Sequence, residues 1–148
     1  MPKTRTFDIK YFNVIVGGIA PEMYADGTAV KFTPDGEDWA FVNGADGATG
    51  RNRTNIKSGI LEITLMQQSP TNTQFSELRT TDLTTPGGAM FPVAIKDVIG
   101  QTAIASDECC VIALPEFENG NGEAASRVWQ IKMTNIDMDN AVLGGNEI

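Results

Sequence analysis

The sequence contains no histidine, and this absence removes several kinds of chemistry at once. Without histidine there is no Ser-His-Asp or Cys-His arrangement to activate a nucleophile, and the commonest metal ligand is missing. The two cysteines, Cys109 and Cys110, are adjacent, so they neither link distant segments nor have zinc-site spacing. We therefore predict a protein that is not an enzyme and has no metal or cofactor, with both thiols reduced and partly buried.

Basic residues are also scarce, with 11 Lys and Arg against 19 Asp and Glu and a formal net charge of -8. This balance disfavours tight binding to a nucleic-acid backbone, which depends on neutralising phosphates. It is compatible with a surface that nucleic acid slides past, because like charges lower adhesion. Long apolar runs are missing too, and the polar N-terminus lacks the apolar core of a secretion signal. We expect a soluble protein made in a cytosol, without a membrane-spanning segment.

What is present fits a single β-rich domain over residues 1–148. The hydrophobic content of 41% is sufficient for one core, and 15 glycines with 7 prolines indicate many turns between short elements. The clearest strand pattern is 59–66, where Leu61, Ile63 and Leu65 share one face. A glycine-rich basic loop at about 43–59 precedes it directly. We predict that this strand meets the core and carries the loop.

Other segments are placed by the same alternation and by turn residues. Pro92 predicts an edge position or a strand start for its segment. A helix is predicted over 70–81, with Ser69 as N-cap, Pro70 as the first helical residue, and Phe75 and Leu78 facing the sheet. Two hairpins are predicted: 28–33 and 38–42, joined by Pro34-Asp35-Gly36, and 90–95 and 102–104. Three further strands are predicted: 7–16 with a bend near Tyr11, 109–114 as a buried strand, and 126–136 with Trp129, Ile131 and Met133 alternating.

The charges are distributed unevenly along the chain. Residues 44–59 carry Asp46 against three bases, Arg51, Arg53 and Lys57. Residues 107–123 contain acids and no base, among them Glu116 and Glu118. Opposite patches on one small chain would set the register of a head-to-tail self-assembling subunit. The alternative is two unrelated solvated loops.

The order and spacing of these features resemble the tail tube proteins of contractile-tailed bacteriophages. The resemblance covers nearly the whole chain, from Gly17-Gly18 and 24–27 to Trp129. It is carried by the run GADGATGRNRTNIKSGILEITLMQQSPTN, then Ser76-Glu77-Leu78, Gly87-Gly88 with Phe91-Pro92, and Ile95-Lys96-Asp97. It implies an antiparallel β-sandwich or barrel-like subunit with one flanking helix. Six such subunits would form a ring, and the rings would stack into a hollow tube.

The resemblance also implies a location and partners. The protein would be part of a virion tail, assembled in the host bacterial cytoplasm. Its partners would be itself, the tail sheath, a baseplate or initiator protein and a tail terminator, while genomic DNA passes through the lumen without specific binding.

Two site hypotheses follow from the tail-tube resemblance. The 43–59 loop reaches a neighbouring subunit or ring, where Arg51, Arg53 and Lys57 meet acidic residues. The predicted interface residues are Asp46, Arg51, Arg53, Lys57, Glu116 and Glu118. Glu62, on the mixed face of its strand, is a candidate lumen-facing acid.

Two other functions stay open at this stage. One is the tube of a related contractile injection or secretion apparatus. The other is a small-ligand or carbohydrate-binding β-sandwich, with Trp39 and Trp129 as a stacking platform and acidic turns as calcium ligands.

Overall fold

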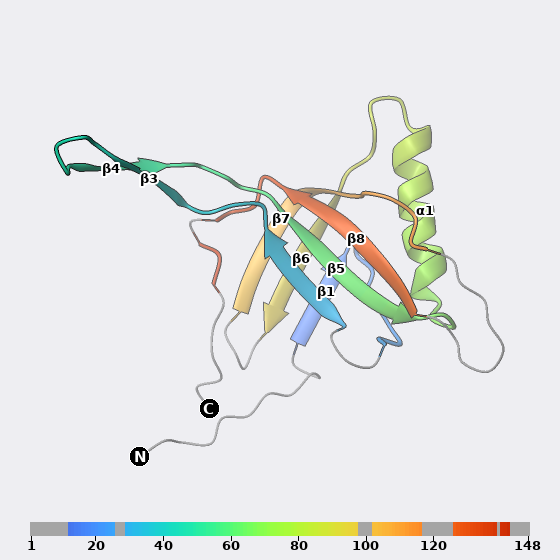
Figure 1. Cartoon of the computed structure of the whole chain (residues 1–148). Helices are drawn as coiled ribbons and strands as arrows, with labels where there is room; N and C mark the ends of the chain where they lie inside the picture. Colours follow the sequence, from blue (N-terminus) through green and yellow to red (C-terminus); the bar gives the residue numbers. More distant parts are fainter. Residues whose placement is uncertain (1–11, 26–28, 98–101, 117–125, 139, 143–148) are drawn as a thin grey trace, which may run out of the picture.

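The computed structural model describes residues 12–25, 29–97, 102–116, 126–138 and 140–142. Over these residues the chain forms eight strands and one helix (Figure 1). The elements are β1 (Phe12–Val16), β2 (Val30–Pro34), β3 (Trp39–Asn43), β4 (Thr49–Arg53), β5 (Gly59–Met66), α1 (Thr71–Thr84), β6 (Phe91–Asp97), β7 (Thr102–Val111) and β8 (Ser126–Thr134).

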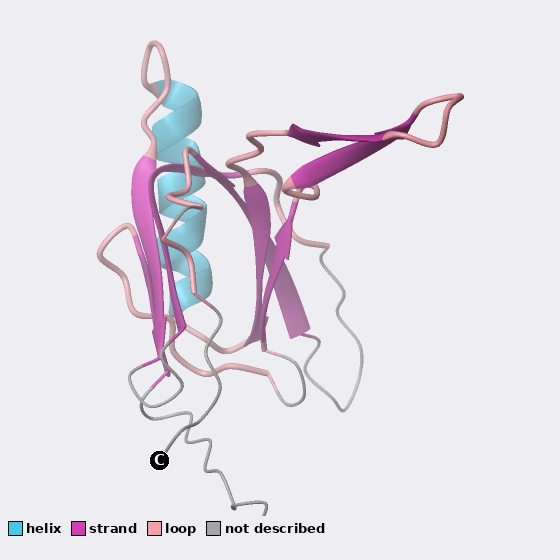
Figure 2. Ribbon diagram, turned by 90° about the vertical axis from the view of Figure 1, so that its left-hand side faces the viewer, coloured by secondary structure: helices cyan, strands magenta, loops and turns pink. Residues whose placement is uncertain are grey.

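Six strands form one sheet in the order β1-β6-β7-β8-β5-β2, and every neighbouring pair is antiparallel. Val14 and Val16 of β1 belong to the same buried cluster as Leu61 and Ile63 of β5, near the other end of the sheet. The sheet therefore curls until its two ends face each other across one core (Figure 2). This confirms a mostly β, antiparallel fold with a single flanking helix.

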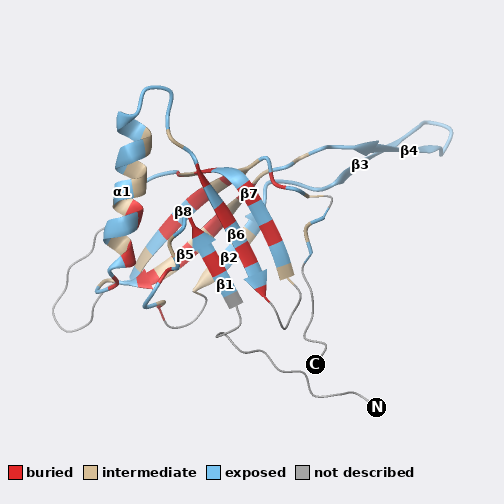
Figure 3. Ribbon diagram, turned by 180° about the vertical axis from the view of Figure 1, so that it is seen from behind, coloured by how far each residue is buried: buried red, intermediate tan, exposed pale blue. Residues whose placement is uncertain are grey.

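β5 and β8 form the centre of this core. Leu61, Ile63 and Leu65 are fully buried, and they alternate with half-buried residues as the sequence pattern predicts. In register, Leu61 lies beside Ile131, and Ile63 lies beside Trp129. The buried stripe is visible across the strands in Figure 3. Because each buried side chain removes apolar area from water, this strand pair is a main source of stability.

Helix α1 flanks the curled sheet. It begins at Thr71 with Pro70 as its N-cap, so the predicted N-cap at Ser69 and first helical residue at Pro70 are each one residue early, and it ends at Thr84, three residues beyond the predicted end. The Ser69 hydroxyl accepts the Thr71 N–H at 3.3 Å and donates to the Glu22 carbonyl at 2.5 Å. Ser69 therefore ties the helix start to the chain before β2. Phe75 packs edge-on against Trp129, with ring centroids 5.6 Å apart.

The predicted 28–42 hairpin is wrong. β2 pairs with β5, whereas β3 pairs with β4, so the Pro34-Asp35-Gly36 turn leads the chain out of the sheet. Part of the predicted 43–59 loop is β4. Local turn chemistry predicted a change of chain direction, and the chain bends at Asp35 and Gly36, but this does not determine which strand the chain pairs with afterwards.

The prediction for Pro92 is half right. β6 lies between β1 and β7, so it is an interior strand, although Pro92 is close to its start. The register shifts between Phe91 and Val93, and this irregularity accommodates the missing N–H of proline. The Pro92 carbonyl still accepts the Gly17 N–H at 2.7 Å.

β7 is one strand that joins the segment predicted as 102–104 to the first three residues of the segment predicted as 109–114. Its pairing with β6, from Asp97 beside Thr102, confirms the second hairpin. The prediction of a buried strand over 109–114 is wrong in its second half, since β7 ends at Val111 and Ile112 and Leu114 are exposed. Residues 7–11 and the bend near Tyr11 lie outside the described residues.

The two cysteines lie near the end of β7. Cys109 is buried and Cys110 half-buried, and both are free, as predicted. Burial raises the pKa of both thiols, so neither has the character of an activated nucleophile.

Candidate functional site: the β3–β4 arm

β3 and β4 form a two-stranded ribbon, here called the arm, that projects from the body (Figures 1 and 2). All ten of its strand residues are exposed. Trp39 pairs with Arg53 and Phe41 with Arg51, so these four side chains share one face because alternate residues of a strand point the same way. We call it the aromatic-basic face. The opposite face carries Ala40, Val42, Gly50 and Asn52.

The arm exposes large apolar side chains on both faces. Phe41 is 66% exposed and Val42 58% exposed. Within the described residues, β3 and β4 pair only with each other. An isolated two-stranded ribbon is marginally stable in water, and its outer edges leave backbone groups open to pairing. The arm has no core of its own, so burying it requires another surface.

The tip of the arm is a tight turn in which Asp46 has a local role. Its carboxylate accepts the Ala48 N–H at 3.1 Å, and the Gly44 N–H donates to the Ala48 carbonyl at 2.6 Å. Gly47 has a φ of +87°, a conformation that side chains with a Cβ rarely adopt. The predicted interface residue Asp46 therefore shapes the arm from within.

Arg51 lies over Trp39, with its guanidinium carbon 3.4 Å from the centre of the indole ring. This cation–π contact covers one face of the ring and holds both side chains on the aromatic-basic face. Trp129, by contrast, is 1% exposed, and its Nε1 donates to Asn72 at 2.9 Å. The predicted stacking platform for a carbohydrate is wrong, because one tryptophan is in the core and the other is already stacked.

The root of the arm is fastened to β8. The Asp35 carboxylate accepts hydrogen bonds from Lys132 and from the Ser58 hydroxyl, and the Asp35 N–H donates to the Ser58 carbonyl at 3.0 Å. The Lys132 hydrogen bond, followed by that of Ser58, lowers the pKa of Asp35. On the returning strand, the Lys57 carbonyl accepts the Ile136 N–H at 2.8 Å. These bonds fix the two chain segments from which the arm emerges.

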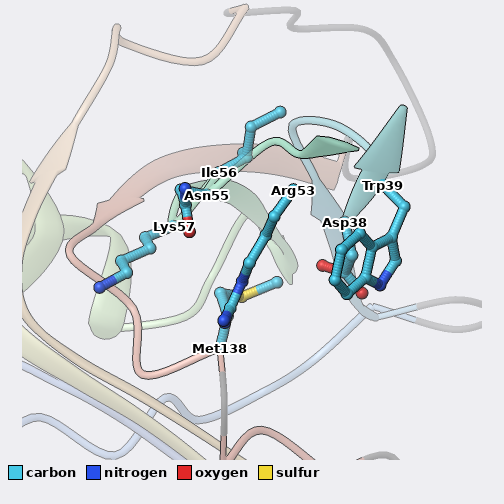
Figure 4. A pocket seen from close by; sticks show the side chains of 7 residues that line it. All are labelled: Asp38, Trp39, Arg53, Asn55, Ile56, Lys57 and Met138. Atoms are coloured by element: carbon cyan, nitrogen blue, oxygen red, sulfur yellow. The ribbon is translucent and has the colours of Figure 1, made fainter. Parts of the chain in front are cut away.

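A pocket of about 250 Å³ lies beside this root (Figure 4). Its lining is mixed in character and comes from the arm and from the segment after β8; the residues are Asp38, Trp39, Arg53, Asn55, Ile56, Lys57 and Met138. In the described part of the chain, no group of three or more His, Cys, Asp or Glu side chains is arranged to hold a metal ion. Two of the predicted basic residues, Arg53 and Lys57, therefore line the same pocket.

The predicted acids lie elsewhere. Glu62 is half-buried on the outer face of β5, where it accepts a hydrogen bond from Gln130 at 3.1 Å. Glu116 is exposed in the segment after β7, beside the start of β8. Glu118 lies outside the described residues. Within one copy, Glu116 is therefore separated from the basic residues of the arm.

Sequence reasoning did not identify Phe41 and Val42 as site residues. They were predicted only as part of a strand. The sequence does contain a signal for them. Because neighbouring residues of a strand point to opposite faces, two adjacent apolar residues make both faces apolar, whereas a half-buried strand is apolar on one face only.

Comparison with known proteins gives a fold. No family model and no curated protein matches the sequence. Among solved structures, the chain is similar to the PVC sheath/tube terminator of an extracellular contractile injection system in its extended state. The TM-score is 0.62 and the identity 10%, over 90% of this chain and 96% of that chain. The anti-feeding prophage cap, a tube-terminating cap, is similar with a TM-score of 0.56 and 9% identity, over 92% of each chain.

At these identities the similarity shows the fold alone. No helix within the described ranges is both long and apolar enough to cross a membrane.

Proposed function

We propose that this protein is a self-assembling structural subunit of the tube of a contractile phage tail or of a related contractile injection apparatus. The observation that carries the proposal is the arm, a two-stranded ribbon that projects from the body and holds Phe41 and Val42 in solvent with no core beneath them. Exposed apolar surface of this kind is typical of a protein–protein contact. Support comes from the fold, which two components of contractile injection systems share over nearly their full length.

Within this proposal the protein occupies the repeated tube, as six-membered rings that stack. The tail-tube resemblance, which covers nearly the whole chain, favours this position. A second candidate is the ring that ends the tube. The specific observation in its favour is that the two similar structures are a terminator and a cap. The partners in either position are further copies of this chain and the adjoining tube, sheath and baseplate proteins.

Electron microscopy of the purified protein tests the proposal. Hollow tubes are expected for a repeated tube subunit, and separate rings for a terminating subunit. Protein that stays monomeric at high concentration would refute both positions. Neither product is expected of a ligand-binding β-sandwich or of an enzyme.

A charge variant tests the role of the arm. Replacing Arg51, Arg53 and Lys57 together with Ser is expected to leave a folded monomer that no longer assembles, because these bases meet acids of another copy. A matched control replaces Lys31, Arg79 and Lys96 with Ser, which removes the same charge from outside the arm. Normal assembly by the arm variant would contradict this role.

The lumen is proposed to carry an excess of carboxylate, so that DNA passes without adhering. Glu62 is the candidate lumenal acid, since it lies on the outer face of the sheet and away from the core. Glu62→Lys is expected to slow DNA delivery by otherwise normal virions, whereas the same reversal at Glu77 on α1 is expected to have no effect. Unchanged delivery by Glu62→Lys would count against a lumenal position.

A further inference from the structure

The arm and the start of β8 lie at opposite ends of the same strand pair. β5 begins at Gly59, where the chain returns from the arm, and ends at Met66. Its partner β8 runs the other way, so Met133 lies beside Gly59 and Ser126 beside Met66. Eight residues of strand span about 23 Å. The arm also points away from the body (Figure 1), so it lies far from the start of its own β8.

A groove of about 420 Å³ lies at this far end. We call it the β8 groove; its lining residues are Ala113, Leu114, Pro115, Glu116, Ser126, Val128 and Gln130. Leu114 and Val128 are 56% and 43% exposed, so apolar side chains in its walls face solvent. The Ile112 N–H donates to the Gln130 carbonyl at 3.1 Å, which holds the segment after β7 against β8.

The β8 groove and the arm have complementary chemistry. Among the residues that line the groove, the one charged side chain is Glu116. On the arm, the exposed Phe41 lies directly opposite Arg51. An apolar side chain beside a cation therefore faces solvent at one end of the molecule, and apolar walls beside a carboxylate face solvent at the other.

We propose that the β8 groove of one copy receives the arm of a second copy, with Phe41 between Leu114 and Val128 and Arg51 facing Glu116. This rests on the proposed self-assembly and names the surface that receives the arm. Such a contact joins two different surfaces of the same chain, so it is head-to-tail and repeats in every copy. It buries the exposed phenylalanine and pairs charges that lie far apart within one copy.

Two variants mixed together test this arrangement. Phe41→Asp removes the arm contact and leaves the groove intact, whereas Val128→Asp blocks the groove and leaves the arm intact. Each variant alone is expected to lose head-to-tail association by about 30-fold or more, because a central apolar contact is replaced by a buried charge. Mixed, they are expected to form a one-to-one heterodimer that stops there, measured by native mass spectrometry. Absence of the heterodimer, with both variants folded by circular dichroism, would overturn the proposal.

A cross-link tests the same contact without removing it. In a Cys110→Ser background, Asn43→Cys places a thiol on the aromatic-basic face near Phe41, and Ser126→Cys places one at the groove. Mixing the two proteins is expected to give an interchain disulfide. The control pairs Asn43→Cys with Ala94→Cys, on the exposed outer face of β6, and is expected to give none. Equal cross-linking in both mixtures would contradict docking in the groove.

The outcomes separate this inference from the proposed function. If the unaltered protein forms rings or tubes while Phe41→Asp and Val128→Asp assemble equally well, the groove is not the receiving surface but the assembly role stands. If the unaltered protein does not assemble at all, the proposed function itself fails.

Discussion

Two antiparallel strand pairs in this molecule, β5–β8 and the β3–β4 arm, have the same backbone pairing and opposite surroundings. In β5–β8, one face carries Leu61 and Trp129 into the core, where they are 0% and 1% exposed. In the arm, both faces meet solvent, and Phe41 is 66% exposed. Backbone pairing alone stabilises a two-stranded ribbon little. The difference indicates that β5–β8 supports the fold, whereas the arm adds surface for contacts outside the monomer.

The largest difference in stability between the two regions is expected when the tryptophan of each is truncated in turn. Trp129→Ala removes the packing on Phe75 and the hydrogen bond to Asn72, and should lower the free energy of unfolding by about 3–5 kcal/mol. Trp39→Ala, on the arm, should change it by less than about 0.5 kcal/mol. Urea unfolding of both variants measures the contrast. Equal losses would mean that the arm contributes to the core.

An intermediate effect is expected from adding one methyl group at a glycine. At Gly59 in β5, a Cβ would lie 2.7 Å from the Phe32 ring and 2.9 Å from the Thr33 carbonyl. Gly59→Ala should therefore cost about 1–3 kcal/mol through overpacking.

The matched position on the arm is Gly50, where a Cβ would come no closer than 3.8 Å, to the Val42 carbonyl. Gly50→Ala should be neutral within about 0.5 kcal/mol. Thermal unfolding of the two variants makes the comparison. A large loss at Gly50 would show that the arm is packed more tightly than its exposure indicates.

Excision of the arm should have a small effect on the monomer. Replacing residues 37–56 with a short Gly-Ser linker leaves the six-stranded sheet complete. The free energy of unfolding is expected to change by about 1 kcal/mol or less, because shortening a surface loop changes closure entropy only slightly. Assembly is expected to disappear. Calorimetry measures the stability and electron microscopy the assembly of one preparation. If the excised protein does not fold, the arm supports the fold and is not only a surface for contacts.

The smallest effect is expected at the junction of the two regions, where Lys132 and Ser58 hold the pKa of Asp35 below its ordinary value. A carboxyl group with a lowered folded-state pKa contributes stability above its unfolded pKa of about 3.9 and loses it as the pH falls through the folded value. NMR titration of Asp35 should show the depression, and Lys132→Met should reduce it. An unchanged pKa in Lys132→Met would assign the shift to another group.

Prediction from the sequence succeeded where a local pattern and the final environment agree. The alternation in 59–66 and 126–134 is the alternation of burial in β5 and β8, and α1 begins directly after Pro70, whose φ suits a helix start. It failed at β2, whose partner is not the next strand in the chain. β2 and β3 were joined as a hairpin because a turn separates them, but β2 adds to β5 and β3 adds to β4.

The sequence by itself determined the fold class, the buried stripes of β5 and β8, the single helix and the basic character of residues 51–57. These properties depend on side-chain spacing and composition, which are local. Only the tertiary structure decided that β3 and β4 leave the sheet and that Glu116 lies at the opposite end of the molecule from Arg51. Those outcomes depend on contacts between residues far apart in the chain, since one turn is compatible with several strand pairings and the burial of a common core selects among them.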